Sequence, residues 1–265
     1  MGKIINIANN KGGCGKSVVS INLATALAIK KKRVLVIDAD PQSNTTTALL
    51  PGDVNLKDTA YELFNPDLEK PLKIDDLIYP TIRKSLYIIP NILETAGHEI
   101  SLIESMTNGK PVYSLLRERC REYCLNNFDY VLIDNMPSLG IFLSLTLAIS
   151  DSVIIPVDVG SAASISGVKN IIDLMGSIAE EINPELTSAK ILTNRVDKRI
   201  SACMANIDSI KMKFGDENIF EASIPTSADF QNAEALPPNT VFDYNLKSKG
   251  AQAFRKIADE FLRIY

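Results

Sequence analysis

Two lysines, a serine and three glycines near the start of the chain have the types and spacing of a phosphate-binding site. Residues 11–17 read Lys-Gly-Gly-Cys-Gly-Lys-Ser and follow the largely apolar run 3–7. Glycines permit positive φ angles, so backbone N–H groups of the loop can close on phosphate oxygens without an intervening Cβ. Lys16 would then reach the β- and γ-phosphates, and the Ser17 hydroxyl would bind Mg²⁺. The following helix would direct its positive N-terminal end at the anion.

This stretch departs at one position from the general phosphate-loop pattern G-x-x-x-x-G-K-[ST]. Asn10 stands where that pattern has its first glycine. Asparagine tolerates left-handed backbone conformations better than most residues, so the turn can still form. Lys11 has no role within its own loop. A glycine-rich turn with two solvated lysines is the alternative, and the strand before and the helix after favour the phosphate site.

Carboxylates follow two apolar runs further along the chain. Residues 34–37 precede Asp38 and Asp40, and residues 130–133 precede Asp134. Unbroken apolar runs are typical of parallel strands covered on both faces, and the C-terminal ends of such strands share one crevice. We therefore expect Asp134 to hold Mg²⁺ through a water and Asp38 to lie in the outer coordination shell of the same ion. Asp40 would orient the attacking water. Ordinary strand-end turns are the alternative.

The elements that must position these residues are those of an α/β fold. The expected fold class is a doubly wound, mostly parallel sheet with helices on both faces. In the first helix, about 17–32, the apolar stripe is Val18, Ile21, Ala24, Thr25 and Ala28. Further strands are expected at 86–89, 152–157 and 189–193, and further helices at about 95–106, 111–126, 164–181 and 247–264. The proline-interrupted stretch 51–85 indicates no chemistry.

Length and composition indicate a single globular domain, 1–265. The chain has 265 residues, is 46% hydrophobic and has a formal net charge of −4. No apolar stretch approaches the ~20 residues of a membrane span, so a soluble cytoplasmic protein is expected. The negative net charge argues against a protein that coats nucleic acid with its whole surface, so contact with DNA would need a local cluster of basic residues. The four cysteines have no paired metal spacing, and His98 has no histidine partner.

The two-lysine form of residues 11–17 resembles the deviant Walker A box of the ParA/MinD family. The run Asp-Ala-Asp-Pro-Gln-Ser-Asn at 38–44 is similar to that family's second box at every fixed position. The resemblance covers nearly the whole chain and is strongest at 3–44, 130–138 and 244–254. It implies an ATPase with Mg²⁺, in which Lys11 reaches the γ-phosphate of a second subunit. Lys11, Lys16 and Asp40 would be catalytic.

The resemblance also implies how the nucleotide base is held. In phosphate-loop proteins of this broad class, an asparagine at the end of a late strand contacts the base, and Asn194 would therefore meet adenine. A turn-forming asparagine is the alternative. The implied nucleotide-binding residues are Gly12, Gly13, Cys14, Gly15, Lys16, Ser17, Val18, Asn194 and Pro225, and the implied metal residues are Ser17, Asp38 and Asp134.

Basic residues gather late in the chain. Segment 195–213 has five basic residues against two acidic ones, although solvated helix faces produce such clusters too. Arg199 falls where ParA-type ATPases have an arginine for non-specific DNA binding, and 247–251, Lys-Ser-Lys-Gly-Ala, resembles their RSRGA segment. The DNA-binding residues implied are Lys198, Arg199, Lys247 and Lys249. Two positions depart from the family pattern, since Met136 replaces a proline after Asp134 and Thr226 replaces an arginine.

The resemblance implies an ATP-dependent homodimer that binds DNA non-specifically. With a ParB-type partner it would move a plasmid or chromosome over the nucleoid. The chain starts at the strand before the phosphate loop, which is similar to the short form of these ATPases without an N-terminal helix-turn-helix. A MinD-like membrane ATPase is the first alternative, disfavoured because no basic, apolar tail follows Tyr265. A relative that positions protein cargo or carries a metal cluster in place of DNA is the second, disfavoured by the DNA-side lysines and by the absence of a paired cysteine site.

Overall fold

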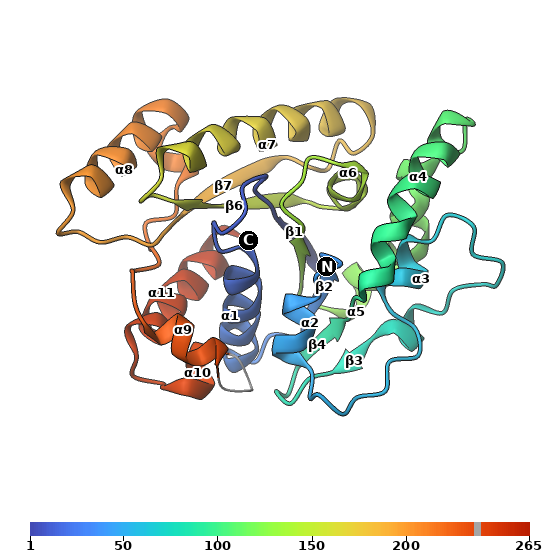
Figure 1. Ribbon diagram of the computed structural model, residues 1–265, viewed down its shortest axis with the longest axis horizontal. Helices are drawn as coiled ribbons and strands as arrows, with labels where there is room; N and C mark the ends of the chain where they lie inside the picture. Colours follow the sequence, from blue (N-terminus) through green and yellow to red (C-terminus); the bar gives the residue numbers. More distant parts are fainter. Residues whose placement is uncertain (236–239) are drawn as a thin grey trace.

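The computed structural model describes residues 1–235 and 240–265, and over this part of the chain a seven-stranded sheet forms the centre of the molecule (Figure 1). The strand order is β3-β4-β2-β5-β1-β6-β7. Neighbouring strands are parallel except for the antiparallel pair β3 and β4 at one edge. The strands are β1 (Lys3–Ile7), β2 (Val34–Ala39), β3 (Tyr79–Pro80), β4 (Leu86–Ile89), β5 (Tyr130–Asn135), β6 (Ser152–Asp158) and β7 (Ser188–Asn194).

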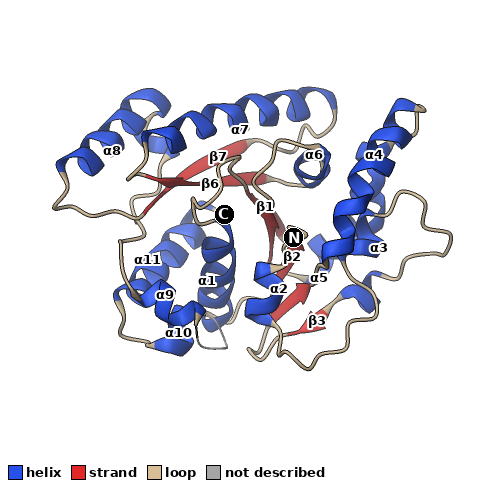
Figure 2. Cartoon of the chain, viewed as in Figure 1, coloured by secondary structure: helices blue, strands red, loops and turns tan. Residues whose placement is uncertain are grey.

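Helices cover both faces of this sheet (Figure 2). Helices α1 and α11 lie on one face, and α6 and α7 pack on the other (Figure 1). The doubly wound, mostly parallel fold class expected from the sequence is confirmed. The helices are α1 (Lys16–Ile29), α2 (Asn44–Leu49), α3 (Ala60–Phe64), α4 (His98–Thr107), α5 (Glu122–Asn127), α6 (Ile141–Leu147), α7 (Ala162–Glu181), α8 (Ser201–Phe214), α9 (Asp229–Glu234), α10 (Val241–Tyr244) and α11 (Lys249–Ile264).

The two faces of the sheet divide the apolar side chains of each strand between separate clusters. In β2, Val34 and Val36 pack with α1 and α11, whereas Leu35 and Ile37 pack with α3 and α6 on the opposite face. This alternation follows from the two-residue side-chain period of a strand. Because both faces are covered, the central strands β2 and β5 consist of unbroken apolar runs up to their carboxylates, which is the pattern that the sequence has.

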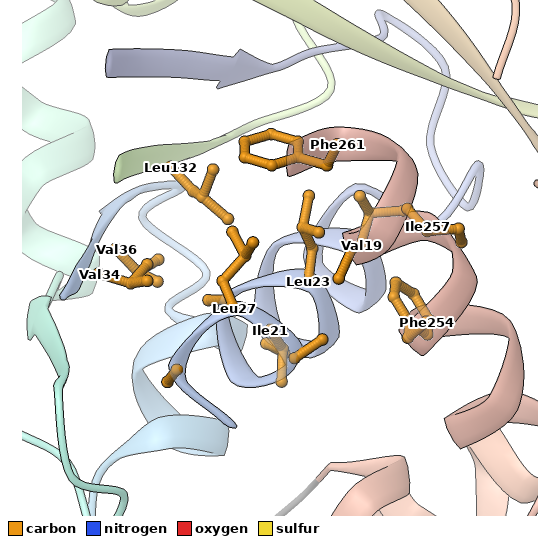
Figure 3. Close-up of a cluster of buried hydrophobic side chains, with 14 of the residues drawn as sticks. Val19, Ile21, Leu23, Leu27, Val34, Val36, Leu132, Phe254, Ile257 and Phe261 are labelled. Atoms are coloured by element: carbon orange, nitrogen blue, oxygen red, sulfur yellow. The ribbon is translucent and has the colours of Figure 1, made fainter. Parts of the chain in front are cut away.

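Helix α1 is buried on more sides than the apolar stripe expected from the sequence. Of the stripe residues, Val18 is half-buried and the other four are buried. Every residue from 19 to 28 is buried. Its side chains gather with Leu132 of β5 and with Phe254, Ile257 and Phe261 of α11 (Figure 3). A helix enclosed between a sheet and a second helix buries several faces, so a one-sided stripe underestimates its burial.

Some element bounds differ from those expected. The stretch 95–106 is a short 3₁₀ turn over Leu93–Gly97 followed by α4, and 111–126 is broken into a 3₁₀ turn, a π-helical turn at Arg117–Arg121 and α5. Within the described residues, no helix has the length and apolar character needed to cross a membrane.

Candidate functional site

The loop between β1 and α1 carries the two lysines and the glycines. Gly13 and Gly15 have positive φ angles of 74° and 95°, and α1 begins at Lys16. The positive angles fall on these glycines, so Asn10 needs no left-handed conformation at its position. A Cβ at Gly13 would meet no heavy atom within 4 Å, which leaves this side of the loop open to a ligand. The loop therefore has the open backbone surface that phosphate binding requires.

Lys16 is buried in this loop, with 6% of its surface exposed. Its Nζ donates a hydrogen bond to the carbonyl oxygen of Lys11 at 3.2 Å. The Cys14 thiol donates to the same carbonyl at 3.3 Å, and burial raises the pKa of this thiol, so Cys14 acts here as a packing residue. Lys16 is thus the ammonium group that the fold places inside the loop, whereas Lys11 remains half-buried at its rim.

Asp38 and Asp134 face each other on neighbouring strands beside the loop. They are direct partners in the register of β2 and β5, and both are fully buried. Thr45 donates to Oδ2 of Asp134 at 2.6 Å, and Ser20 of α1 donates to Oδ1 at 3.0 Å. Thr46 donates its backbone N–H and its hydroxyl to Oδ2 of Asp38, at 2.8 and 2.7 Å. Helix α2 thereby attaches to both carboxylates.

Burial governs the protonation of this pair. Burial and then the charge of Asp134 raise the pKa of Asp38 to about 8, and burial also raises the pKa of Asp134. Hydrogen bonds from Thr45, and then from Ser17 and Ser20, oppose that rise in the pKa of Asp134. Two buried carboxylates beside a serine hydroxyl are hard oxygen donors, the type that Mg²⁺ prefers. The residues present therefore fit a Mg²⁺ site next to the phosphate loop.

We expect Asp38→Asn to stabilise the metal-free protein increasingly as the pH rises. A carboxyl whose pKa is raised by folding favours the folded state below its unfolded pKa, and this stability is lost between about pH 4 and pH 8. Asparagine does not ionise and avoids the loss. The melting temperature in EDTA should therefore rise relative to the unaltered chain by about 5 °C or more between pH 6 and pH 8.5. Asp53→Asn, at an exposed loop position, is the control. Parallel pH profiles for Asp38→Asn and the unaltered chain would contradict the prediction.

Asp40 lies in the turn that follows β2 and is 8% exposed. Its Oδ1 accepts the N–H of Gln42 at 2.9 Å, and its own N–H donates to Oδ1 of Asp38 at 3.2 Å. These bonds hold the Asp40 carboxylate next to the buried pair. The carboxylates that the sequence singled out are thus brought together with the phosphate loop.

Asn194 ends β7 beside the phosphate loop, and Pro225 lies in a segment that pairs with the chain just after β7. The Asn194 amide donates to the carbonyl of Cys14 at 2.8 Å, and Pro225 pairs with Val196 in an isolated parallel bridge. Val18 is half-buried in the first turn of α1.

The implied DNA-binding residues are exposed and partly adjacent. Lys198, Arg199, Lys247 and Lys249 are all exposed. Arg199 makes two side-chain hydrogen bonds to Asp197, at 2.9 and 2.7 Å. These bonds, with a smaller contribution from the charge of Lys249, lower the pKa of Asp197 to about 2. Arg199 and Lys249 therefore lie close enough to act on one carboxylate, although they are far apart in the sequence.

Four polar residues of this site carry no motif that predicts them from the sequence. They are Asn9, Ser20, Thr45 and Thr46. The threonine run 45–47, directly after the second box, was the available signal for two of them.

Asn135, next to Asp134, donates to the side chain of Asn6 at 2.8 Å and accepts from Thr146 at 2.7 Å. The start of the loop behind Asp134 is thus fixed by a polar network, beside the position where Met136 replaces proline.

Comparisons with known proteins agree with this geometry. Residues 2–188 match the family described as "AAA domain". The sporulation initiation inhibitor protein Soj of Bacillus subtilis is 31% identical, over 98% of both chains. The chromosome partitioning protein ParA of Myxococcus xanthus is 29% identical, over 99% of this chain and 89% of that protein. Cobyrinic acid a,c-diamide synthase from Mycobacterium smegmatis, with bound ADP and magnesium, has a TM-score of 0.79 and 25% identity, covering 99% of this chain and 95% of that one.

Proposed function

The chain belongs to the ParA/MinD family of phosphate-loop ATPases, and from this premise we propose that it is a DNA partition ATPase switched by nucleotide-dependent dimerisation. ATP and Mg²⁺ are its cofactors. Its ATP form would bind DNA non-specifically and act with a ParB-type partner. We further propose that residues 1–265 form one ATPase domain. The observation that carries the DNA-binding proposal is the exposed cluster of Arg199 and Lys249 beyond the strand end that also contacts the phosphate loop.

The roles proposed within the nucleotide site follow from position and burial. The backbone from Gly12 to Val18 would wrap the phosphates, and Lys16 would donate to the β- and γ-phosphates from inside the loop. Ser17, Asp38 and Asp134 would hold Mg²⁺, which supplies neutralisation of phosphate charge when bound. Asp40 would orient a water for attack on the γ-phosphate. Pro225 would line the nucleotide from the segment beside β7.

Lys11 supports the proposed dimer because it has no partner for its charge within the described residues. Its Nζ makes no ion pair there, whereas its backbone carbonyl is used by Lys16. A half-buried lysine at the rim of a phosphate loop is positioned to reach an anion outside its own loop. In a dimer with the two loops facing each other, that anion is the γ-phosphate of the partner subunit.

Dimerisation would make DNA binding depend on ATP. Two copies of the basic patch formed by Arg199 and Lys249, one on each subunit, contact more phosphates than one copy does. Because counterion release scales with the number of phosphates neutralised, affinity for duplex DNA should increase steeply in the dimer. Hydrolysis would then separate the subunits and release the DNA.

The test is duplex-DNA binding by the full chain without nucleotide, with ADP, and with ATP and Mg²⁺, each at two salt concentrations. Salt-sensitive binding only with ATP supports the proposal. Binding of ATP with no DNA affinity in any state would overturn the DNA function. ATP-dependent sedimentation with anionic liposomes in that case would favour the membrane alternative.

We expect Arg199→Ala to weaken ATP-dependent DNA binding about 5-fold or more and to make its salt dependence shallower. The reason is the loss of one exposed guanidinium, and therefore of one phosphate contact, from each subunit. Filter binding or fluorescence anisotropy over a salt series measures both effects. Lys3→Ala removes an exposed charge at the opposite ends of the strands and is the matched control. Equal DNA affinity for Arg199→Ala and the control would show that the patch is wrongly placed.

A further inference from the structure

Asn194, the last residue of β7, is tied into the protein at both ends of its carboxamide. Its Nδ2 donates to the carbonyl oxygen of Cys14 at 2.8 Å. Its Oδ1 accepts the N–H of Arg195 at 2.7 Å, and Arg195 has a positive φ of 55°. Asn194 is only 4% exposed. The side chain therefore bridges the end of an outer strand and the phosphate loop.

The contact with Asn194 leaves no room for a side chain at position 15. A Cβ built at Gly15 would lie 2.2 Å from Nδ2 of Asn194, closer than real Cβ atoms approach another heavy atom. The remaining nearby atom is also from Asn194, at 3.4 Å. The glycine thus meets two requirements, the positive φ angle of 95° and the close approach of the Asn194 amide.

The start of the loop is fixed in a similar way by Asn9. Its Nδ2 donates to the carbonyl of Pro156 in β6 at 2.8 Å, and its Oδ1 accepts the N–H of Lys11 at 3.0 Å. One carboxamide therefore ties the loop to β6 at its start, and a second ties it to β7 two residues before Lys16.

We propose that Asn194 is a positioning residue for the phosphate loop. In a planar trans peptide the carbonyl and the N–H point in opposite directions. By holding the Cys14 carbonyl toward β7, Asn194 turns the N–H of Gly15 away from β7 and toward the phosphates. It also keeps a carbonyl oxygen, which would repel phosphate, out of the anion site. This inference rests on the nucleotide site proposed above.

Ligands without a base distinguish a residue that positions the loop from a residue that contacts the base. A residue that sets the loop acts on any ligand with the same phosphates. A residue that reads adenine acts on ATP, changes the preference for ATP over GTP, and has no effect on inorganic tripolyphosphate. Affinities for these three ligands therefore separate the two roles.

The experiment is calorimetric titration of the full chain and its Asn194→Ala variant with ATP, GTP and tripolyphosphate, each with Mg²⁺. We expect Asn194→Ala to weaken all three by the same factor, about 3- to 10-fold, the range for one lost hydrogen bond. Asn194→Asp keeps the size but places an acceptor against the Cys14 carbonyl, so it should weaken all three at least as much. Loss of ATP affinity with unchanged tripolyphosphate affinity would overturn the proposal in favour of a base contact.

Asn206→Ala is the matched control. Asn206 donates to the carbonyl of Val159 at 2.8 Å, a bond of the same kind beyond β6 that does not touch the phosphate loop. Its removal should leave all three affinities unchanged. Equal weakening in Asn206→Ala would assign the effect to general destabilisation and overturn the proposal. If the unaltered chain bound neither ATP nor tripolyphosphate, the nucleotide site itself would fail, and this inference with it.

Discussion

Lys16→Ala is expected to weaken ATP binding by on the order of 100-fold or more, which is the largest effect on binding that the site supports. The Lys16 ammonium is buried inside the loop and donates to the Lys11 carbonyl, whereas the ammonium of Lys11 belongs to a half-buried side chain at the rim. A charge-assisted hydrogen bond to phosphate contributes about 1.5–3 kcal/mol, and one ammonium can make more than one. Equilibrium binding of a fluorescent ATP analogue measures the loss directly.

Lys11→Ala is the matched control for this prediction. It removes an ammonium from the same loop, but one that lies at the rim and makes no ion pair within the described residues. ATP binding by the single subunit should therefore survive in Lys11→Ala, whereas ATP-dependent dimerisation should be lost. Lys16→Met preserves apolar packing and separates loss of binding from loss of folding. Near-normal ATP affinity in a folded Lys16→Met variant would contradict the assignment.

Asp40→Ala is expected to retain ATP binding and dimerisation and to lose hydrolysis by about 100-fold or more. Asp40 lies just beyond the last residue of β2 that pairs with β5, and its backbone N–H donates to Asp38. Correct orientation of a water supplies a large part of the barrier reduction in phosphoryl transfer, so loss of the orienting group should affect turnover and not affinity. Phosphate release and nucleotide affinity, measured on the same preparation, give the two quantities.

Asp40→Asn distinguishes the chemistry of Asp40 from its structural role. The Asp40 Oδ1 also accepts the N–H of Gln42 at 2.9 Å, and an asparagine oxygen can accept that bond equally well. If the charge orients the water, Asp40→Asn should hydrolyse ATP as slowly as Asp40→Ala. Normal hydrolysis in Asp40→Asn with slow hydrolysis in Asp40→Ala would show that Asp40 acts only by holding the turn. Normal hydrolysis in both variants would remove Asp40 from the catalytic residues.

The local elements were predictable where one physical rule dominates. Unbroken apolar runs such as 34–37 and 130–133, each only four residues long and ending at a carboxylate, indicated buried parallel strands, because a strand covered on both faces has no polar positions. The segments 95–106 and 111–126 were less regular than expected. In the second of these segments, the buried side chain of Arg121 donates to Asp151 and to the carbonyl of Ile149. No local sequence pattern predicts these contacts.

The sequence by itself determined the chemistry of the phosphate loop and the sheet that carries it. Glycine at 13 and 15, lysine at 16 and the carboxylates directly after the apolar runs 34–37 and 130–133 are local features, because backbone freedom and side-chain charge belong to single residues. Only the tertiary structure decided which groups meet. It placed Asp38 opposite Asp134, attached Thr45 and Thr46 to them, and brought Asn194 from 180 residues away onto the Cys14 carbonyl. Such contacts depend on strand order and register, which a packed core sets and no single stretch of sequence contains.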